Sequence, residues 1–249
     1  AILVCVPVPE AEALPDDVAR DAVERAIADA EAAGVHGPAL TPWLLARVAA
    51  LTGGRSVRAN TALIVNNAGV AIAGPFADTK EEDFDFVMDV NVYGPYRVTK
   101  AFTPLIVASK GRITTIGSIS GILSSRDLGV YSMSKHAIEA FADSLEQQMA
   151  PLGVGVSVVE PGNYNSEIGK SAVKRTGAPA RLADRSQYKP PDEVAAAVEL
   201  ALFEANPKHR YMVVPSQFEA EITIKKAIEE LAQLNERHAY SYDRDALVK

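Results

Sequence analysis

A tyrosine and a lysine stand four residues apart in the run Tyr131-Ser132-Met133-Ser134-Lys135. In a helix this spacing puts both side chains on the same face, one turn from each other. An ammonium beside a phenol stabilises the phenolate, and moving the phenol pKa from about 10 towards 7 takes roughly 4 kcal/mol. The pair is therefore a candidate proton donor and acceptor near neutral pH, although the same spacing is also common on solvated helix faces.

Further polar and glycine-containing motifs follow apolar runs elsewhere in the chain. Ser118 ends the run 112–118, which is typical of a buried parallel strand that leads into a loop. The carboxyl ends of such strands are where open α/β sheets bind ligands. Two more runs end in the same manner, one at Asn66-Asn67-Ala68-Gly69 and one at Pro161-Gly162, and Asn91 lies within a helical pattern.

This ordered set of motifs resembles the short-chain dehydrogenase/reductase family over about residues 62–249. The resemblance implies that Tyr131 is the general acid/base and that Lys135 lowers its pKa and contacts the nicotinamide ribose. It further implies that Ser118 holds the substrate oxygen near the phenol, and that Asn91 holds a water linking Lys135 to solvent. The expected catalytic residues are thus Asn91, Ser118, Tyr131 and Lys135.

The same resemblance implies a nicotinamide cofactor, NAD or NADP, and a small-molecule alcohol or carbonyl substrate. The expected cofactor-binding residues are Asn67, Ala68, Gly69, Tyr131, Lys135, Pro161 and Gly162. The resemblance also implies a homodimer or homotetramer that forms through helices at about 92–109 and 131–149. Residues 122, 123, 164 and 168 are candidates for an apolar substrate pocket, but core packing would explain them equally well.

The family's glycine-rich phosphate loop, T-G-x-x-x-G-x-G, has no counterpart in the sequence. The nearest match, 51–56, lacks the later glycines, and Gly53 is better explained as the C-terminal stop of a helix. Pro7 and Pro9 follow the first strand, where they remove backbone donors that a pyrophosphate would need. A second hypothesis is therefore a catalytically silent protein that acts as a structural or interaction module.

Residues 1–68 resemble the C-terminal part of pseudouridine-5′-phosphate glycosidase, and the run 59–68 fits both families. The glycosidase's catalytic residues lie in a part that is not represented, so its activity is not expected here. A natural fusion, an engineered chimera and a sequence-assignment artefact would all give this pattern.

The composition excludes several classes of protein. The 249 residues are 48% hydrophobic and carry a net charge of −7, with a pI near 5.2, which argues against nucleic-acid and anionic-membrane partners. The single cysteine, Cys5, excludes an internal disulfide and favours a cytoplasmic location. The four histidines show no ligand spacing, so no metal is expected.

Strand and helix patterns alternate along the chain, which predicts a parallel sheet with helices on both faces. The fold class is α/β: a single Rossmann-like, doubly wound domain over 1–249, in which 1–61 is an altered or truncated N-terminal half. The segment 163–189 is polar and is expected to be a mobile lid or disordered. Strands are expected at 1–6, 61–67, 112–117, 154–160 and 211–214, and helices at 14–34, 41–53, 79–109, 131–149, 192–204 and 218–238.

Overall fold

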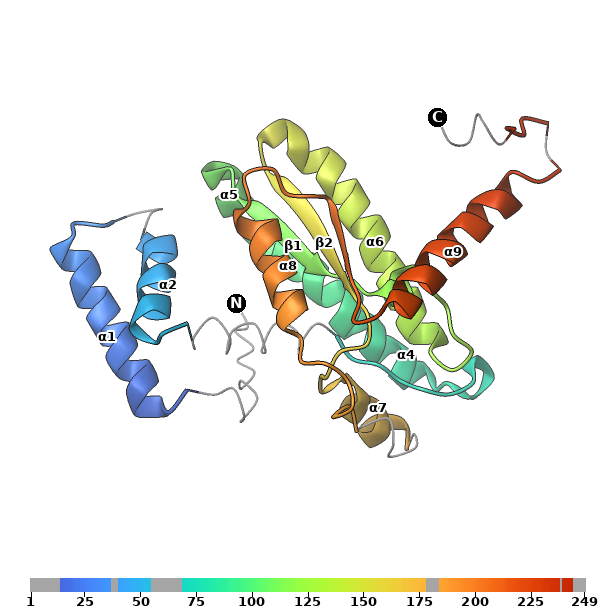
Figure 1. Ribbon diagram of the computed structural model, residues 1–249, viewed down its shortest axis with the longest axis horizontal. Helices are drawn as coiled ribbons and strands as arrows, with labels where there is room; N and C mark the ends of the chain where they lie inside the picture. The colour runs from blue at the N-terminus through green and yellow to red at the C-terminus, as the bar shows by residue number, and fades with distance from the viewer. Residues whose placement is uncertain (1–13, 37–39, 55–68, 178–183, 238, 244–249) are drawn as a thin grey trace.

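Three parallel strands form the sheet in the part of the chain that the structure describes (Figure 1). The computed structural model describes residues 14–36, 40–54, 69–177, 184–237 and 239–243. Strand β2 (Gly155–Pro161) lies between β1 (Arg112–Ile116) and β3 (Arg210–Val213) and pairs in parallel with both. These three strands confirm the predictions; those expected at 1–6 and 61–67, and the five-strand sheet they would complete, lie outside the described residues.

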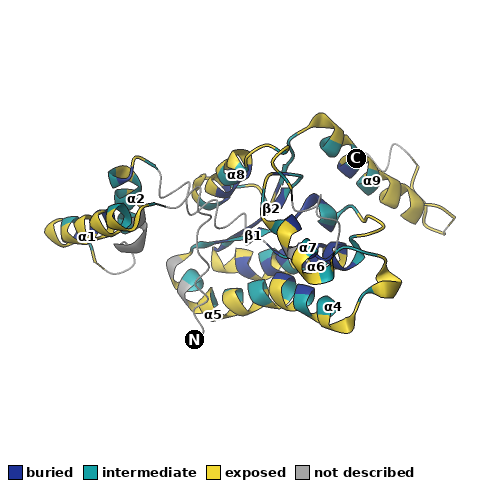
Figure 2. Ribbon diagram, turned by 90° about the horizontal axis from the view of Figure 1, so that it is seen from below, coloured by how far each residue is buried: buried dark blue, intermediate teal, exposed yellow. Residues whose placement is uncertain are grey.

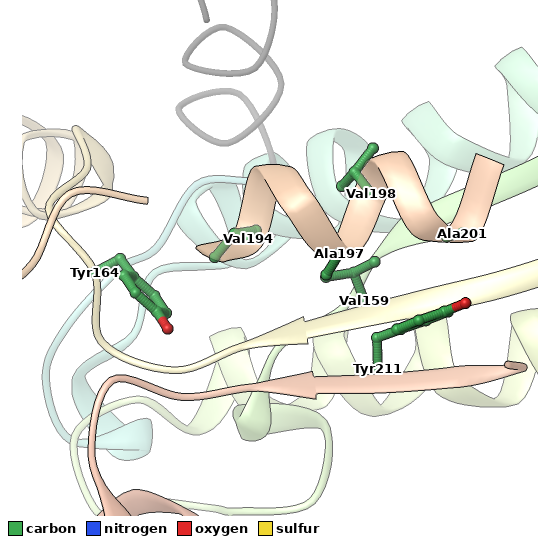
Figure 3. Packing of buried hydrophobic residues seen from close by; sticks show 7 residues of the cluster. All are labelled: Val159, Tyr164, Val194, Ala197, Val198, Ala201 and Tyr211. Carbon is green, nitrogen blue, oxygen red and sulfur yellow. The ribbon is translucent and has the colours of Figure 1, made fainter. Parts of the chain in front are cut away.

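Helices cover both faces of β2 because its apolar side chains are buried in both directions. Val158 and Val159 are fully buried and, as neighbours in a strand, point to opposite faces. Val158 packs with α6 (Gly129–Met149), and Val159 packs with α8 (Asp192–Phe203). The α/β fold class is confirmed. Figure 3 shows the cluster on the α8 side, which comprises Val159, Tyr164, Val194, Ala197, Val198, Ala201 and Tyr211.

The helix predicted over 79–109 is interrupted by one π turn. It consists of α4 (Glu81–Met88), the π segment η3 (Asp89–Tyr93) and α5 (Gly94–Ser109), after a short 3-10 turn at Phe76–Asp78. π turns are rare and cluster at functional sites, and this one contains Asn91. The inner side of α5 packs through Ile106 and Val107 against the Ile113 cluster at the edge of the sheet.

Helices α1 (Asp16–Ala32) and α2 (Leu40–Leu51) form a pair that lies apart from the sheet in Figure 1. Three alanines of α1 are buried, at positions 22, 26 and 30. Gly34 and Gly53 end the two helices with left-handed backbone (φ 66° and 58°), which confirms the predicted stops. The helix expected at 41–53 is confirmed, and it begins one residue earlier than expected, at Leu40.

The segment 163–189 is more ordered than its composition predicts, because it contains helix α7 (Ile168–Thr176). Arg175 of α7 donates from Nε to Asp83 Oδ1 on α4 at 2.6 Å. Its guanidinium also lies 4.0 Å from the centre of the Phe86 ring. These contacts dock α7 against α4, so the expectation of disorder is wrong for residues 168–176.

The last helix, α9 (Gln217–Leu234), begins at Ser216, whose Oγ accepts from the Glu219 N–H at 3.3 Å. It ends before the predicted His238, because the Asn235 side chain pairs with the backbone of Tyr242. Two further 3-10 turns are η4 (Ile119–Gly121) and η5 (Ala150–Leu152). Figure 2 shows buried residues gathered on α6 and β2, whereas α9 is largely exposed. No described helix is long and apolar enough to cross a membrane.

Candidate functional site

Four predicted catalytic residues are buried near the carboxyl ends of β1 and β2. Tyr131 and Lys135 lie on the inner face of α6, Ser118 follows β1, and Asn91 lies in the π turn. A hydrogen bond joins the side chains of Ser118 and Tyr131. Ser118, Tyr131 and Lys135 line one cavity of about 320 Å³, so the structure places a phenol, a hydroxyl and an ammonium around the same space.

The Lys135 ammonium is held by the end of β1. Its Nζ donates to the Ile116 carbonyl at 3.0 Å and lies 5.7 Å from the centre of the Tyr131 ring. Burial lowers the pKa of Lys135 to about 8, and the nearby Glu139 carboxylate opposes this shift. The lysine therefore loses its positive charge at a pH only slightly above neutral.

The pKa of Tyr131 moves in the opposite direction to the one expected from the sequence. Burial raises it, while the hydrogen bond with Ser118 and the charge of Arg185 act to lower it. The desolvation of a fully enclosed phenol outweighs these two contributions, and Lys135 is not among the groups that shift it. The phenol is therefore protonated at neutral pH.

The Asn91 side chain clamps the backbone at Val70 to helix α6. Its Oδ1 accepts from Val70 N at 2.8 Å, and its Nδ2 donates to Val70 O and to Ser134 Oγ, both at 2.9 Å. Ser134 in turn donates to the Tyr131 carbonyl at 2.7 Å. Both Nδ2 hydrogens are thus used within the protein, and the amide has no donor left for the water that the sequence assigns to it.

Gly69 lies directly against this clamp. Its φ of 151° favours glycine, and a Cβ there would lie 2.8 Å from Asn91 Oδ1. The predicted cofactor residues Asn67 and Ala68 lie outside the described residues, whereas Gly69 lines the cavity. No side chain larger than hydrogen is accommodated at this point of the cavity wall.

Pro161 and Gly162 bring the end of β2 to the same cavity. A Cβ on Gly162 would overlap the Glu219 carboxylate, which accepts from the Asn163 N–H at 2.9 Å. Glycine at 162 therefore lets this turn pack closely against Glu219. Of the four apolar candidates, those at 123, 164 and 168 line the cavity, and the one at 122 does not.

Two features of the site were not predicted from the sequence. Arg185, which precedes α8, lines the cavity and acts electrostatically on Tyr131. Glu139 and Glu160 lie buried behind Lys135. The spacing of Glu139, one turn after Lys135, could have indicated its place on the inner helix face. Nothing in the local sequence indicates Arg185, because its position depends on the course of the whole segment 163–189.

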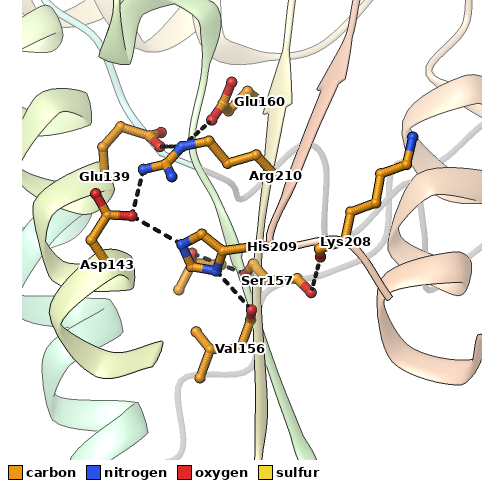
Figure 4. Close-up of polar contacts among 9 residues, drawn as sticks. Glu139, Asp143, Val156, Ser157, Glu160, Lys208, His209 and Arg210 are labelled. Atoms are coloured by element: carbon orange, nitrogen blue, oxygen red, sulfur yellow. Dashed lines mark hydrogen bonds and ion pairs between the residues drawn. The ribbon is translucent and has the colours of Figure 1, made fainter. Parts of the chain in front are cut away.

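Arg210 links a group of carboxylates behind the cavity, as Figure 4 shows. Its Nε lies 3.2 Å from Glu160 and 3.5 Å from Glu139, and its Nη2 donates to Asp143 at 2.6 Å. His209 also contacts Asp143, at 2.9 Å. Burial, and then the adjacent Glu160, raise the pKa of Glu139 to about 8. Among the described residues no group of acidic, histidine or cysteine side chains could hold a metal ion.

We expect Glu139→Gln to change how stability depends on pH. A carboxyl whose pKa is raised on folding binds more protons folded than unfolded, so its contribution to stability falls as pH rises from about 4.5 to about 8. The glutamine variant lacks this loss. The melting temperature of the variant minus that of the wild type should therefore be larger at pH 8.5 than at pH 5.5. Each kcal/mol of stability that the wild type loses should increase this difference by roughly 2–4 °C.

Glu199→Gln, on the exposed side of α8, is the matched control. Its melting temperature should differ from that of the wild type by the same amount at pH 5.5 and at pH 8.5. An equal difference for Glu139→Gln at the two pH values would contradict the raised pKa. Differential scanning calorimetry of the three proteins measures the effect.

A parallel sheet covered on both faces, with polar side chains gathered at the carboxyl ends of its strands, defines a doubly wound α/β protein. Residues 57–177 match a family model described as short chain dehydrogenase, and residues 1–74 match one described as Indigoidine synthase A like protein. Residues 57–177 are thus similar to the short chain dehydrogenase family, as the motifs indicated. The second match confirms the resemblance stated for residues 1–68.

Curated proteins show the same sequence similarity, and solved structures share the fold. D-beta-hydroxybutyrate dehydrogenase, mitochondrial, of Bos taurus is 46% identical over 101 residues, which are 41% of this chain and 29% of that protein. Among solved structures, a short-chain dehydrogenase from Streptomyces avermitilis has a TM-score of 0.58 at 24% identity, covering 92% of this chain and 93% of that one. One from Burkholderia cenocepacia, in complex with NADP, has a TM-score of 0.53 at 23% identity, covering 68% and 65%. The chain spans less than half the length of the curated relatives it matches.

Proposed function

We propose that the chain is an oxidoreductase that interconverts an alcohol and a carbonyl with NAD or NADP. The observation that carries the proposal is the convergence of Ser118, Tyr131 and Lys135 on one cavity at the carboxyl edge of a parallel sheet. Similarity to the short chain dehydrogenase family supports it, as does the NADP bound by the Burkholderia cenocepacia neighbour.

The cavity accommodates the nicotinamide end of such a cofactor. Gly69, Pro161 and Gly162 line it without bulky side chains, beside Tyr131 and Lys135. When bound, the cofactor supplies or accepts the hydride. The Lys135 ammonium, fixed by the Ile116 carbonyl, would hold the ribose hydroxyls.

The proton steps fall to the residues of the chain. Burial keeps the Tyr131 hydroxyl protonated at neutral pH, which suits donation to a carbonyl oxygen during reduction. The Ser118 hydroxyl, joined to Tyr131 by a hydrogen bond, would orient that oxygen. The phenolate that remains would be stabilised by the hydrogen bond from Ser118 and by the charge of Arg185, and it would recover its proton in the reverse reaction.

Titration of the protein with NADH and with NADPH tests the proposal. Binding of either nucleotide, seen as a change in nucleotide fluorescence and as calorimetric heat, is the expected result, with ATP as the control. The absence of a recognisable glycine-rich loop favours the alternative, a catalytically silent structural or interaction module. If neither nucleotide binds at millimolar concentration, that alternative holds and the oxidoreductase proposal fails.

We also propose three general features that the sequence predicts. They are one Rossmann-like domain over 1–249, a chimeric N-terminal segment, and a cytoplasmic location. A homodimer or homotetramer is supported by exposed apolar side chains along η3 and α5, because Tyr93, Val98 and Phe102 are each more than half exposed. Light scattering measures the mass, and a monomer would contradict this assembly.

A further inference from the structure

Arg185 is held in a fixed position at the wall of the cavity. Its Nε donates to the Tyr164 carbonyl at 2.9 Å, and its Nη2 donates to Asn163 Oδ1 at 3.3 Å. Its guanidinium carbon lies 4.5 Å from the centre of the Tyr188 ring. All three partners are neutral, so they orient the guanidinium without forming an ion pair with it.

The cavity is cationic, although the chain as a whole has a net charge of −7. Among the described residues that line it, Arg185 and Lys135 are charged and none is an aspartate or glutamate. Glu219 acts electrostatically on Arg185, but its carboxylate accepts from Asn163 N and lies outside ion-pair distance of the guanidinium. The hydrogen bonds that Arg185 makes to the described residues come from Nε and Nη2.

The remaining wall of the cavity is largely apolar. The side chains that make it so come from η4 and the loop after it, from α7 and from α9: Ile119, Leu123, Ile168, Ala172 and Ile222. A space of about 320 Å³ with this lining accommodates a small ligand that carries a short hydrocarbon part.

We infer that Arg185 binds the carboxylate of the substrate, and that the chain acts on small hydroxy- or oxo-carboxylates with a short apolar side chain. A guanidinium presents paired N–H donors that match a carboxylate. Arg185 and the Ser118–Tyr131 pair would then hold the substrate at two points, which fixes the carbonyl against the proton donor. The reaction at the carbonyl rests on the proposed function; the carboxylate site does not.

Binding of butanoate and its neutral isostere butanamide, followed by saturation-transfer NMR, tests the site without any turnover. Butanoate should bind at least about 10-fold more tightly than butanamide. Arg185→Gln should weaken butanoate binding roughly 10- to 100-fold and leave butanamide unchanged. Arg126→Gln removes the same charge at an exposed position outside the cavity lining and is the control.

Turnover gives the second readout. 2-Oxobutanoate and 3-oxobutanoate are each compared with their methyl esters, using NADH and NADPH. Arg185→Gln should lower kcat/KM for the acids roughly 10- to 100-fold and for the esters less than about 3-fold. Arg185→Lys keeps the charge and loses the paired donors, so its kcat/KM for the acids should lie between the values of the wild type and the glutamine variant.

The outcomes separate this inference from the proposed function. Carboxylate binding that depends on Arg185, without reduction of any carbonyl, supports the site and contradicts the oxidoreductase. Equal binding of butanoate and butanamide by the wild type overturns the site, whether or not the variants fold. Weaker binding of NADH or NADPH to Arg185→Gln, with preference for the acids unchanged, would assign Arg185 to the cofactor phosphates and overturn the inference.

Discussion

Tyr131→Phe is expected to lower kcat by about 10²- to 10⁴-fold for any carbonyl that the wild type reduces, because it removes the hydroxyl that donates the proton. Nucleotide binding should remain nearly unchanged, since the ring and its contact with Lys135 persist. Loss of the hydrogen bond with Ser118 should cost only about 0.5–1.5 kcal/mol of stability. Steady-state kinetics and nucleotide titration measure the two effects.

Tyr96→Phe is the matched control, because Tyr96 lies exposed on α5 with only a weak contact from Lys100 at 3.4 Å. It should keep wild-type activity. A Tyr131→Phe variant that retained full kcat would remove Tyr131 from the chemistry. A variant that lost nucleotide binding together with kcat would assign the residue a structural role.

Asn91→Leu should destabilise the protein by about 2–5 kcal/mol. Leucine keeps the branch at Cγ but forms no hydrogen bonds, so both the N–H and the carbonyl of Val70, and the Ser134 hydroxyl, lose their partner. Each unsatisfied buried polar group costs about 1–3 kcal/mol. Urea unfolding measures the free energy, and a lower midpoint with an unchanged slope is expected.

Asn206→Leu, at an exposed position, provides the comparison and should change stability by less than about 0.5 kcal/mol. If Asn91→Leu unfolded at the wild-type urea concentration while losing activity, Asn91 would act in proton transfer rather than as the clamp. Asn91→Asp keeps the acceptor for Val70 N but loses both donors. Its free energy of unfolding should therefore lie between those of the wild type and Asn91→Leu.

The strands and most helices could be predicted because local patterns determine them. The β-branched run before Glu160 is buried on both faces of β2, and the acidic first turn of α1 follows Pro15, as the sequence indicates. Helix α7 could not be predicted in this way. Its position depends on Arg175 reaching Asp83 and Phe86, which lie about ninety residues earlier in the chain.

Some residues of the site could be predicted from local sequence, and others could not. Tyr131 and Lys135 share a helix face at a spacing that is visible in the sequence, and Ser118 closes a recognisable strand. The direction of the Tyr131 pKa could not be predicted, because it depends on how completely the fold encloses the phenol. Arg185 could not be predicted either, since its place at the cavity follows from contacts with Asn163, Tyr164 and Tyr188.

The proton-transfer residues and the substrate-contacting residues of the cavity come from different stretches of the chain, so the two sets can be substituted independently. Ser118 follows β1, and Tyr131 and Lys135 belong to α6, whereas Ile168, Ala172 and Arg185 belong to the segment after β2. Exchange of residues 163–189 for the corresponding segment of a relative would therefore replace substrate selection and leave proton transfer in place. Diversification of this chain, by natural drift or by laboratory recombination, should concentrate its accepted substitutions there.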